Sequence, residues 1–219
     1  DIGFRLARSR NNGAREASGD YLIFLDQDVI FDNDFIESIY NSRRKKRMIF
    51  SEALGSSLEE KNKIQELINT QKFDYKEIYD LVDNTKKVEQ DQIVNKEKFY
   101  NFLYKLKLRS RGAKIVGLIF SLFKEDFINI NGLDEKYIGY GYEDDDFGNR
   151  FFKYGGETFA FKMKRYPIHM YHKAASPNGS PNEDYYRQRK IEISKKNYRC
   201  EYGYDKTFGE DKYKVIEIK

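Results

Sequence analysis

The sequence reads Tyr21-Leu22-Ile23-Phe24-Leu25-Asp26-Gln27-Asp28-Val29 at the point that decides the fold. Residues 21–25 form a continuous apolar, aromatic-rich run, and such a run between turn-forming residues predicts a strand buried on both faces. Strands of this kind lie inside α/β sheets, where ligands bind outside the carboxyl ends of the strands. Asp26 and Asp28 stand at that end. The sequence therefore predicts an α/β fold with a ligand site after this strand.

The two acids share one face if the chain stays extended, because side chains at i and i+2 point the same way. Two carboxylates this close repel unless a cation lies between them. Mg²⁺ and Mn²⁺ combine such carboxylates with the phosphates of a substrate. A second interpretation is a polar strand end, with Asp32 or Asp34 capping the next helix. Asp-x-Asp alone does not decide between the two.

Length and composition indicate one folded, soluble α/β domain. The chain has 219 residues, 39% of them hydrophobic, with 17 Phe and 18 Tyr, which argues against disorder despite a mean hydropathy of −0.83. The 40 basic and 36 acidic residues nearly balance, so we expect no nucleic acid partner. A single Cys200 and the lack of a spanning or signal segment favour a cytoplasmic protein. The start at Asp1, without Met, leads us to expect a fragment or a processed chain.

The residues around the strand alternate between helical and extended patterns, as in α/β units. Residues 4–20 predict a helix, and Arg10 on it either reaches a phosphate or faces solvent. Residues 31–42 predict a second, amphipathic helix, and residues 48–50 a short strand. The run Arg43-Arg44-Lys45-Lys46-Arg47 lies between these two elements. It suits phosphate or an anionic membrane surface, or it is a solvated helix end.

Residues 56–111 are dense in Lys, Glu, Asn and Gln and predict two or three helices inserted into the domain. We expect this insertion to touch substrate or a partner. Its aromatic and basic end, residues 96–111, suits a membrane surface or an acidic partner, with packing against the sheet as the plainer alternative. Residues 113–123 predict the next buried strand, in which Gly117 leaves room for a close approach.

A second candidate site is Gly139-Tyr140-Gly141-Tyr142-Glu143-Asp144-Asp145-Asp146, where four acids follow a loop of alternating Gly and Tyr. The loop offers flexible backbone and flat rings, which suit a sugar ring. Acids at the start of a following helix are stabilised by its dipole, and one of them can accept a proton from a hydroxyl. An ordinary acidic helix start explains the four acids alone equally well.

Together the two segments resemble glycosyltransferases. The first looks like the central segment of GT-A glycosyltransferases of family 2, through Ala7-Arg8, Arg10-Asn11, Gly13-Ala14, Gly19-Asp20-Tyr21 and Leu25-Asp26-Gln27-Asp28. The second, Asn131-Gly132-Leu133-Asp134-Glu135 followed by residues 139–146, is similar to the acceptor segment of the β-1,4-galactosyltransferases and chondroitin-polymerase-like enzymes. The likeness covers residues 1 to about 50 and 112 to about 182. It implies a GT-A type mixed sheet flanked by helices.

The resemblance implies an inverting, metal-dependent transfer of a Gal, GalNAc or GlcNAc type sugar. The donor is a UDP-sugar, and the acceptor is a glycan or glycolipid in surface polysaccharide synthesis. It assigns Asp28 to the metal, Asp26 to the ribose or the metal, and Asp144 to the general base. It assigns Glu143 and Asp145 to the acceptor hydroxyls. The other substrate-binding candidates are Arg10, Asn11, Gly117, Tyr140 and Gly141.

His169 and His172 are the only two histidines, and they follow a predicted strand at a spacing of i, i+3. A lone His is more often structural, but two near a proposed metal site favour ligands. Galactosyltransferases of this type complete the metal site from a comparable segment, so His172 is the first choice and His169 the second. Imidazole beside carboxylate favours Mn²⁺ over Mg²⁺. Residues 176–182 then predict a mobile loop, and residues 185–198 a basic helix.

Several departures from these relatives leave the acceptor open. The related galactosyltransferases have Trp at the positions of Ile138 and Tyr140 and Gly at that of Tyr142. The family's first strands, which bind uracil and ribose, do not precede Asp1, so we expect an incomplete donor site. Two rival functions are a nucleotidyltransferase, which has no use for the Tyr and Gly loop, and a non-catalytic carbohydrate-binding or scaffolding fragment. Oligomeric state and peripheral association with the inner face of a membrane stay open.

Overall fold

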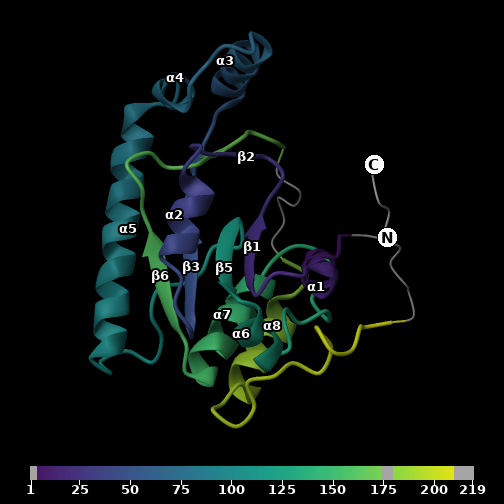
Figure 1. Ribbon diagram of the computed structural model, residues 1–219. Helices are drawn as coiled ribbons and strands as arrows, with labels where there is room; N and C mark the ends of the chain where they lie inside the picture. Colours follow the sequence, from purple (N-terminus) through teal and green to yellow (C-terminus); the bar gives the residue numbers. More distant parts are fainter. Residues whose placement is uncertain (1–3, 174–179, 210–219) are drawn as a thin grey trace.

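The computed structural model describes residues 4–173 and 180–209. They form a mixed α/β fold around a four-stranded sheet (Figure 1). In sequence order its strands are β1 (Tyr21–Leu25), β3 (Arg47–Ser51), β5 (Ile119–Phe123) and β6 (Glu157–Phe161). Their spatial order is β1-β5-β3-β6, with β5 antiparallel to both neighbours and β6 parallel to β3. The predicted mixed sheet flanked by helices is confirmed.

Helices cover both faces of this sheet, because successive side chains of a strand point to opposite faces. On one face Ile49 packs with Phe35 and Ile39 of α2. On the other face Phe50 belongs to a larger core that includes Phe147 of α7. The helices next to the sheet and at the end of the described chain are α1 (Leu6–Glu16), α2 (Phe35–Asn41), α6 (Lys124–Asn129), α7 (Glu143–Tyr154) and α8 (Glu183–Glu192).

The strand β1 lies at the edge of the described sheet and pairs with β5. Only its Leu22 is buried, and Leu25 is 37% exposed. The prediction of a strand buried on both faces is therefore wrong for β1, because an apolar run does not distinguish an edge strand from a central one. The central strand β3 is the buried one, with residues 48–51 all inaccessible to solvent or nearly so.

A second sheet of three short strands lies at the carboxyl end of β1. It includes part of the segment that follows β6. Its strands are β2 (Val29–Ile30), β4 (Leu54–Gly55) and β7 (Ile168–His169). The strand β7 is central, and Val29 pairs with His169 across the antiparallel ladder. Because β2 begins directly after Asp28, this pairing brings His169 beside that acid.

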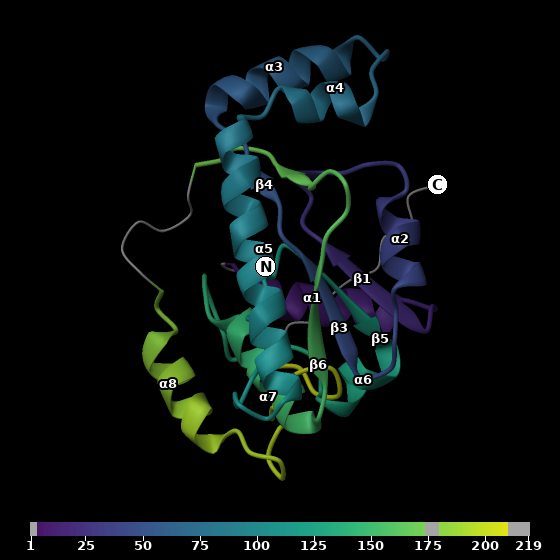
Figure 2. The same ribbon diagram turned by 90° about the vertical axis from the view of Figure 1, so that its left-hand side faces the viewer.

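Residues 56–111, for which two or three helices were predicted, contain three. These are α3 (Leu58–Asn69), α4 (Tyr75–Asp80) and α5 (Asn84–Lys105). Ser57 and Asp74 begin the first two through capping boxes. The long α5 runs beside β6 along the sheet, while α3 and α4 stand beyond one end of it (Figure 2). That this region is an insertion within one domain stays a prediction.

Two of the elements predicted after residue 112 are shorter in the structure. The predicted strand over residues 113–123 shortens to β5, because residues 113–118 leave the ladder and approach α7 instead. The predicted basic helix over residues 185–198 is α8, which ends at Glu192. Most of the predicted loop 176–182 lies outside the described residues, which resume at Ser180. Across the described ranges, no helix combines the length and apolar character needed to cross a bilayer.

Candidate active site

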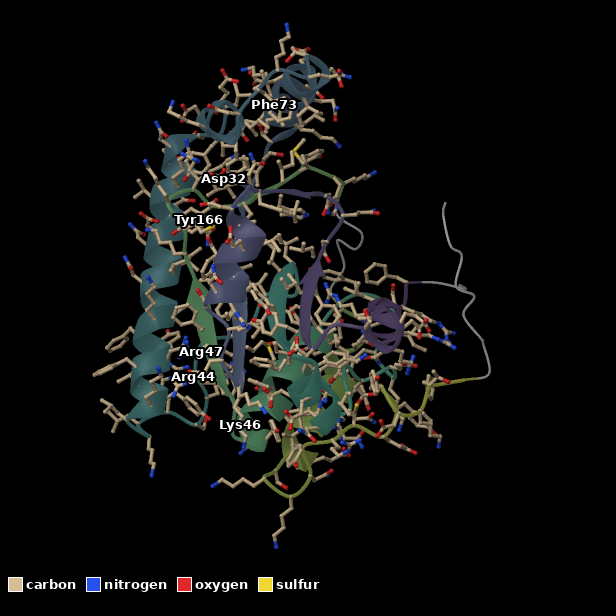
Figure 3. The ribbon with its side chains drawn as sticks, in the orientation of Figure 1. Asp32, Arg44, Lys46, Arg47, Phe73 and Tyr166 are labelled. Atoms are coloured by element: carbon tan, nitrogen blue, oxygen red, sulfur yellow. The ribbon has the colours of Figure 1, made fainter. Side chains whose placement is uncertain are left out.

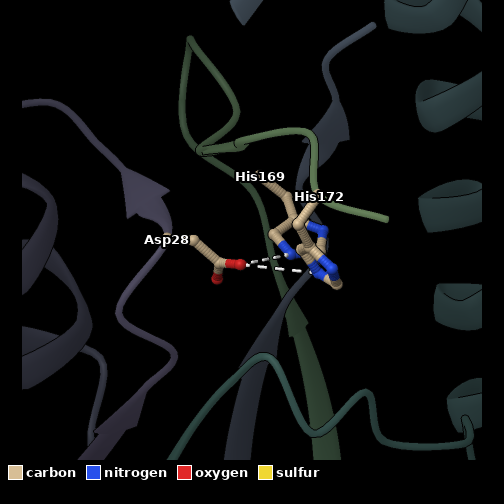
Figure 4. Close-up of side chains that lie close together, drawn as sticks. All are labelled: Asp28, His169 and His172. Atoms are coloured by element: carbon tan, nitrogen blue, oxygen red, sulfur yellow. Dashed lines mark ion pairs between the residues drawn. The ribbon is translucent and has the colours of Figure 1, made fainter. Parts of the chain in front are cut away.

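Asp28 and the two histidines meet at the carboxyl end of β1 (Figure 4). Asp28 Oδ2 lies 3.3 Å from His169 Nε2 and 3.5 Å from His172 Nε2. Ligand atoms bound to one first-row ion at about 2.1 Å, at angles between right and tetrahedral, lie about 3.0–3.5 Å apart. The spacing and the mixed oxygen and nitrogen donors therefore fit a divalent transition-metal ion.

The tautomer of His172 is compatible with metal binding. Its Nδ1 lies 3.1 Å from the backbone oxygen of Lys173, which can only accept a hydrogen bond. A proton on Nδ1 would donate to this oxygen, and in that neutral tautomer Nε2 presents a lone pair to a metal ion. A backbone acceptor on the far nitrogen is the usual way in which a protein orients a histidine ligand.

Backbone contacts hold the histidine segment in place. Met170 N donates to Asp28 O at 2.8 Å, which locks the register of β2 and β7. On the other side Tyr171 N donates to Ser56 Oγ at 2.8 Å, and Lys61 Nζ donates to Tyr171 O at 2.8 Å. Because Lys61 belongs to α3, the helical region 56–111 braces the loop that presents His172.

Asp26 has a different set of neighbours from Asp28. The strand ends at Leu25, and residues 27 and 28 lie in a turn, so the extended-chain prediction that both acids share a face is wrong. Asp26 Oδ1 accepts a hydrogen bond from Arg10 Nη2 at 2.9 Å. The same Arg10 nitrogen donates to Gly117 O at 2.6 Å. The buried Arg10 thus joins α1, the end of β1 and the turn just before β5.

The Gly and Tyr loop bends through left-handed backbone conformations. Gly139 and Gly141 have φ values of 82° and 103°, and Tyr142 has 73°, which is uncommon for a bulky residue. A Cβ on Gly141 would come within 2.8 Å of Ser180 Oγ, so both the backbone and the space require glycine here. The loop delivers the chain to the first turn of α7, where the four acids begin.

The four acids at the start of α7 have separate surroundings. Asp146 is fully buried and pairs with Arg150 at 2.6 Å, so it supports the fold. Glu143, Asp144 and Asp145 line a pocket of about 320 Å³ together with Lys114, residues 140–142 and Ser180. Of the four consecutive acids, Asp146 therefore stabilises the fold and the other three line the pocket.

Asp144 is the acid best placed to accept a proton. Its Oδ2 accepts from Gly117 N at 3.1 Å, and its Oδ1 accepts from Asp145 N at 2.8 Å. Burial raises the pKa of Asp144 above its ordinary value, and the charge of Asp145 adds to this, while Lys114 opposes it. A carboxylate held by two backbone N–H groups with a raised pKa is a stronger base than a free aspartate.

Two models of glycosyltransferase families match the chain. The family model described as "Glycosyl transferase family 2" matches residues 1–90, and that described as "N-terminal domain of galactosyltransferase" matches residues 97–173. The chain is thus similar to family 2 glycosyltransferases over its first 90 residues and to galactosyltransferases over residues 97–173. Together the two matches include both histidines, both acids after β1 and the pocket acids.

A crystal structure of GalNAc-T7 with UDP, GalNAc and Mn²⁺ aligns with 81% of this glycosyltransferase chain and 32% of that chain. The two are 14% identical, with a TM-score of 0.44, a likeness that bears no argument about chemistry. The glycosyltransferase chain thus spans about a third of the length of that protein. No curated protein matches it.

Sequence reasoning placed Asn11 of the glycosyltransferase chain at the substrate, and its position does not support this. Asn11 is fully buried; its Nδ2 donates to Leu133 O and Glu135 Oε1, and its Oδ1 accepts from Leu133 N. These bonds tie α1 to the turn at residues 131–135. The pair Arg10-Asn11, which resembles the family motif, therefore holds the elements around the site in position.

Sequence reasoning also missed two residues of the pocket. Lys114 Nζ pairs with Asp145 Oδ2 at 2.8 Å, and its side chain is 58% exposed at the pocket. The signal was a lone cation inside an otherwise apolar run. Ser180 Oγ donates to Tyr140 O at 2.5 Å and closes the loop from the α8 side. No local pattern marks that serine, because its partner is 40 residues away.

Glu143 carries an unmatched polar atom inside the pocket wall. Its Oε2 is buried and has no hydrogen-bond partner within residues 4–173 and 180–209, and the same holds for Arg10 Nη1. Burial raises the pKa of Glu143, and the neighbouring Asp144 adds to this. A buried acceptor or donor without a partner is costly, so these atoms are positions where a bound hydroxyl or phosphate would be stabilised.

Proposed function

We propose that this chain transfers a Gal, GalNAc or GlcNAc type sugar from a UDP-sugar to a hydroxyl of a glycan or glycolipid, with inversion at the anomeric carbon. The observation that carries the proposal is the meeting of Asp28, His169 and His172 at the carboxyl end of β1. Ligand sites of open α/β sheets lie at this end.

Asp28, His172 and His169 would hold the divalent cation, and their nitrogen donors favour Mn²⁺ over Mg²⁺. When bound, the cation supplies charge neutralisation for the diphosphate that leaves the sugar. Asp26 lies outside this ligand set and faces Arg10, so we assign it to the donor's ribose.

The acceptor enters the pocket in front of α7. Its hydroxyl donates its proton to Asp144 as the hydroxyl oxygen attacks the anomeric carbon. The bond between that carbon and the diphosphate oxygen breaks, and one displacement inverts the configuration. Glu143 and Asp145 hold neighbouring hydroxyls, and the exposed ring of Tyr140 and the bare backbone of Gly141 face the sugar.

Calorimetric titration tests the metal and donor assignments. We expect Mn²⁺ to bind at one site and UDP to bind only in its presence. Both signals should disappear in Asp28→Ala and His172→Ala. They should persist in Asp20→Ala, a solvent-exposed acid just before β1. Equal UDP binding with and without Mn²⁺ in wild type and both variants would overturn the metal site.

Turnover tests the general base. Asp144→Asn keeps the shape of the side chain but cannot take a proton, so we expect turnover of the UDP-sugar to fall by about 10²–10⁴-fold. Binding of Mn²⁺ and UDP should be unchanged in this variant. NMR of the product anomer decides the stereochemistry, and a retained configuration would contradict the single displacement.

A further inference from the structure

The outward face of α5 carries apolar side chains that the described fold leaves uncovered. Phe99, Phe102 and Leu106 recur at helical spacing and are 56%, 56% and 53% exposed, and Leu108 just beyond the helix is 70% exposed. The opposite face of the same helix carries the buried Val94. We call Phe99, Phe102, Leu106 and Leu108 the α5 stripe.

Cations surround the α5 stripe. Residues 92–111 contain six cations and one acid, Glu97, which is partly buried and bonds to Glu52. The guanidinium of Arg109 lies 3.8 Å from the centre of the Tyr100 ring, and Tyr100 adds an amphipathic aromatic group. The six cations are Lys96, Lys98, Lys105, Lys107, Arg109 and Arg111.

The basic run 43–47, remote in sequence, adjoins the same end of α5. Glu157 pairs with both Arg47 Nη2 at 2.6 Å and Lys105 Nζ at 3.2 Å. Figure 3 shows Arg44, Lys46 and Arg47 near the lower end of this helix. A pocket of about 290 Å³ opens there, lined by residues 44–46, Tyr104 and residues 155–157. We call it the basic pocket.

Arg44 gives the basic pocket an available charge. Among residues 4–173 and 180–209, Lys45 pairs with Glu125 and Arg47 with Glu157, whereas no ion pair involves Arg44. The Lys46 ammonium lies over the Tyr154 ring at 4.8 Å. A planar guanidinium group next to ammonium groups is suited to phosphate oxygens.

We propose that the α5 stripe and the basic pocket together bind the surface of a membrane rich in anionic lipids. The Phe and Leu side chains enter the boundary between headgroups and acyl chains, and the basic pocket receives lipid phosphate. The ring of Lys side chains favours this over a protein partner, because Lys is depleted in the cores of protein interfaces. On a membrane, Lys and Arg stems lie along the apolar layer while their charges reach the phosphates.

The proposed surface leaves the candidate active site open. The strands β1 and β3 run parallel, since each is antiparallel to β5, so their carboxyl ends lie together. Arg47 begins β3, whereas Asp26 follows the end of β1, and five residues of strand span about 17 Å. A membrane at the basic pocket therefore faces the end of the sheet opposite to the metal ligands.

Flotation with lipid vesicles tests the proposal. We expect the wild-type chain to float with vesicles of equimolar phosphatidylcholine and phosphatidylglycerol and to stay behind with pure phosphatidylcholine. Salt should weaken the binding, because exposed charges are screened over about 8–10 Å at physiological ionic strength. Inorganic phosphate at the same concentration as the lipid headgroups should not compete, because it lacks the apolar layer.

Two double variants separate the two parts of the surface. The double variant Arg44→Gln with Lys45→Gln removes two positive charges. It should lower the partition coefficient about thirtyfold, since each basic residue near an anionic surface contributes about 1 kcal/mol. Phe99→Ser with Phe102→Ser should lower it at least about tenfold. Ile191→Ser and Lys72→Glu are matched controls, because both side chains are exposed on other helices or turns, and they should bind as wild type does.

Three results would overturn the proposal. They are absence of flotation with the anionic vesicles, equal flotation with neutral ones, and unchanged flotation in both double variants. A wild-type dimer that Phe99→Ser with Phe102→Ser converts to a monomer, without vesicle binding in either, would make the α5 stripe a protein interface. Circular dichroism melting of each variant confirms that it is folded. Mn²⁺ binding at Asp28 is measured separately, so failure here does not depend on the proposed transferase.

Discussion

Arg10 is hydrogen-bonded through a single nitrogen to Asp26, at 2.9 Å, and to the backbone oxygen of Gly117, at 2.6 Å. The amide nitrogen of Gly117 in turn donates to Asp144 at 3.1 Å. One buried guanidinium therefore links the acid proposed for the donor to the acid proposed as the base. The link fixes the distance between the two halves of the site.

Replacing Arg10 with Lys tests this link. Lysine keeps the charge but not the planar fork, so it cannot hold both partners in the same geometry. We expect kcat/KM for the UDP-sugar to fall about tenfold or more, because misplacement of reacting groups is costly even when they remain present. The unfolding free energy should fall by about 1–3 kcal/mol, since Gly117 O and Asp26 lose a charged donor.

The control for that substitution is Arg187→Lys, at an exposed arginine on α8 that pairs with Glu183. Steady-state kinetics and urea unfolding of both variants are the measurements. Unchanged kinetics in Arg10→Lys would show that the bridge does not position the site.

The pH dependence of turnover should report the pKa of Asp144. Burial and Asp145 raise this pKa, and the base works only when ionised, so activity falls as the pH drops through a value above the ordinary one for Asp. Removing the opposing charge with Lys114→Met raises the pKa further. The acidic limb of kcat/KM should then move to higher pH, and Lys72→Met should leave it in place. A limb that moves to lower pH in Lys114→Met contradicts this electrostatic account.

The sequence predicted the acids and histidines of the site because each lies beside a local pattern. Asp28 lies just after the apolar run of β1, His169 ends the short strand β7, and His172 follows it. Their mutual geometry was not readable, because it depends on the pairing of β2 with β7 across about 140 residues of chain. Local periodicity predicts individual helices and strands. Which side chains meet in a site depends on the pairing of strands that are distant in sequence.

The errors have the same origin. Burial of β1 on both faces and a common face for Asp26 and Asp28 were inferred from local periodicity alone. The edge position of β1 and the turn at residues 27–28 depend on neighbours that a local pattern does not contain. Asn11 was assigned to substrate through family likeness, whereas its buried bonds to Leu133 and Glu135 are long-range contacts. Tertiary context decided each of these cases.

Gly141 offers a test of the acceptor pocket with an internal control. Gly141 and Gly155 both have positive φ, at 103° and 97°, so alanine should cost about 1–2 kcal/mol of stability at either position. A Cβ at Gly155 meets nothing within 4 Å, whereas one at Gly141 meets Ser180. We therefore expect Gly141→Ala to raise KM for the acceptor and Gly155→Ala to leave it unchanged. If both variants are equally destabilised and have the same KM for the acceptor, the loop does not take part in acceptor binding.

Glu97 and Glu52 form a carboxyl pair between α5 and the end of β3. Burial raises the pKa of Glu97 to about 9, and the charge of Glu52 adds to this. Burial also raises the pKa of Glu52, while its interaction with Glu97 opposes the rise. The folded protein thus keeps a proton on the pair that the unfolded chain releases near the ordinary value of 4.5.

This proton makes stability depend on pH in a defined direction. Between about pH 5 and about pH 9 the folded state binds more protons than the unfolded state, so the unfolding free energy falls as the pH rises. Glu97→Gln removes the requirement for the proton. After allowance for partial exposure, we expect this variant to be more stable than wild type by about 1–2 kcal/mol near pH 8 and nearly equal to it near pH 5. Urea unfolding across this range measures the difference, and Glu89→Gln, an exposed acid on the same helix, should show none of it. A constant difference at every pH would mean that the two carboxyl groups do not share a proton.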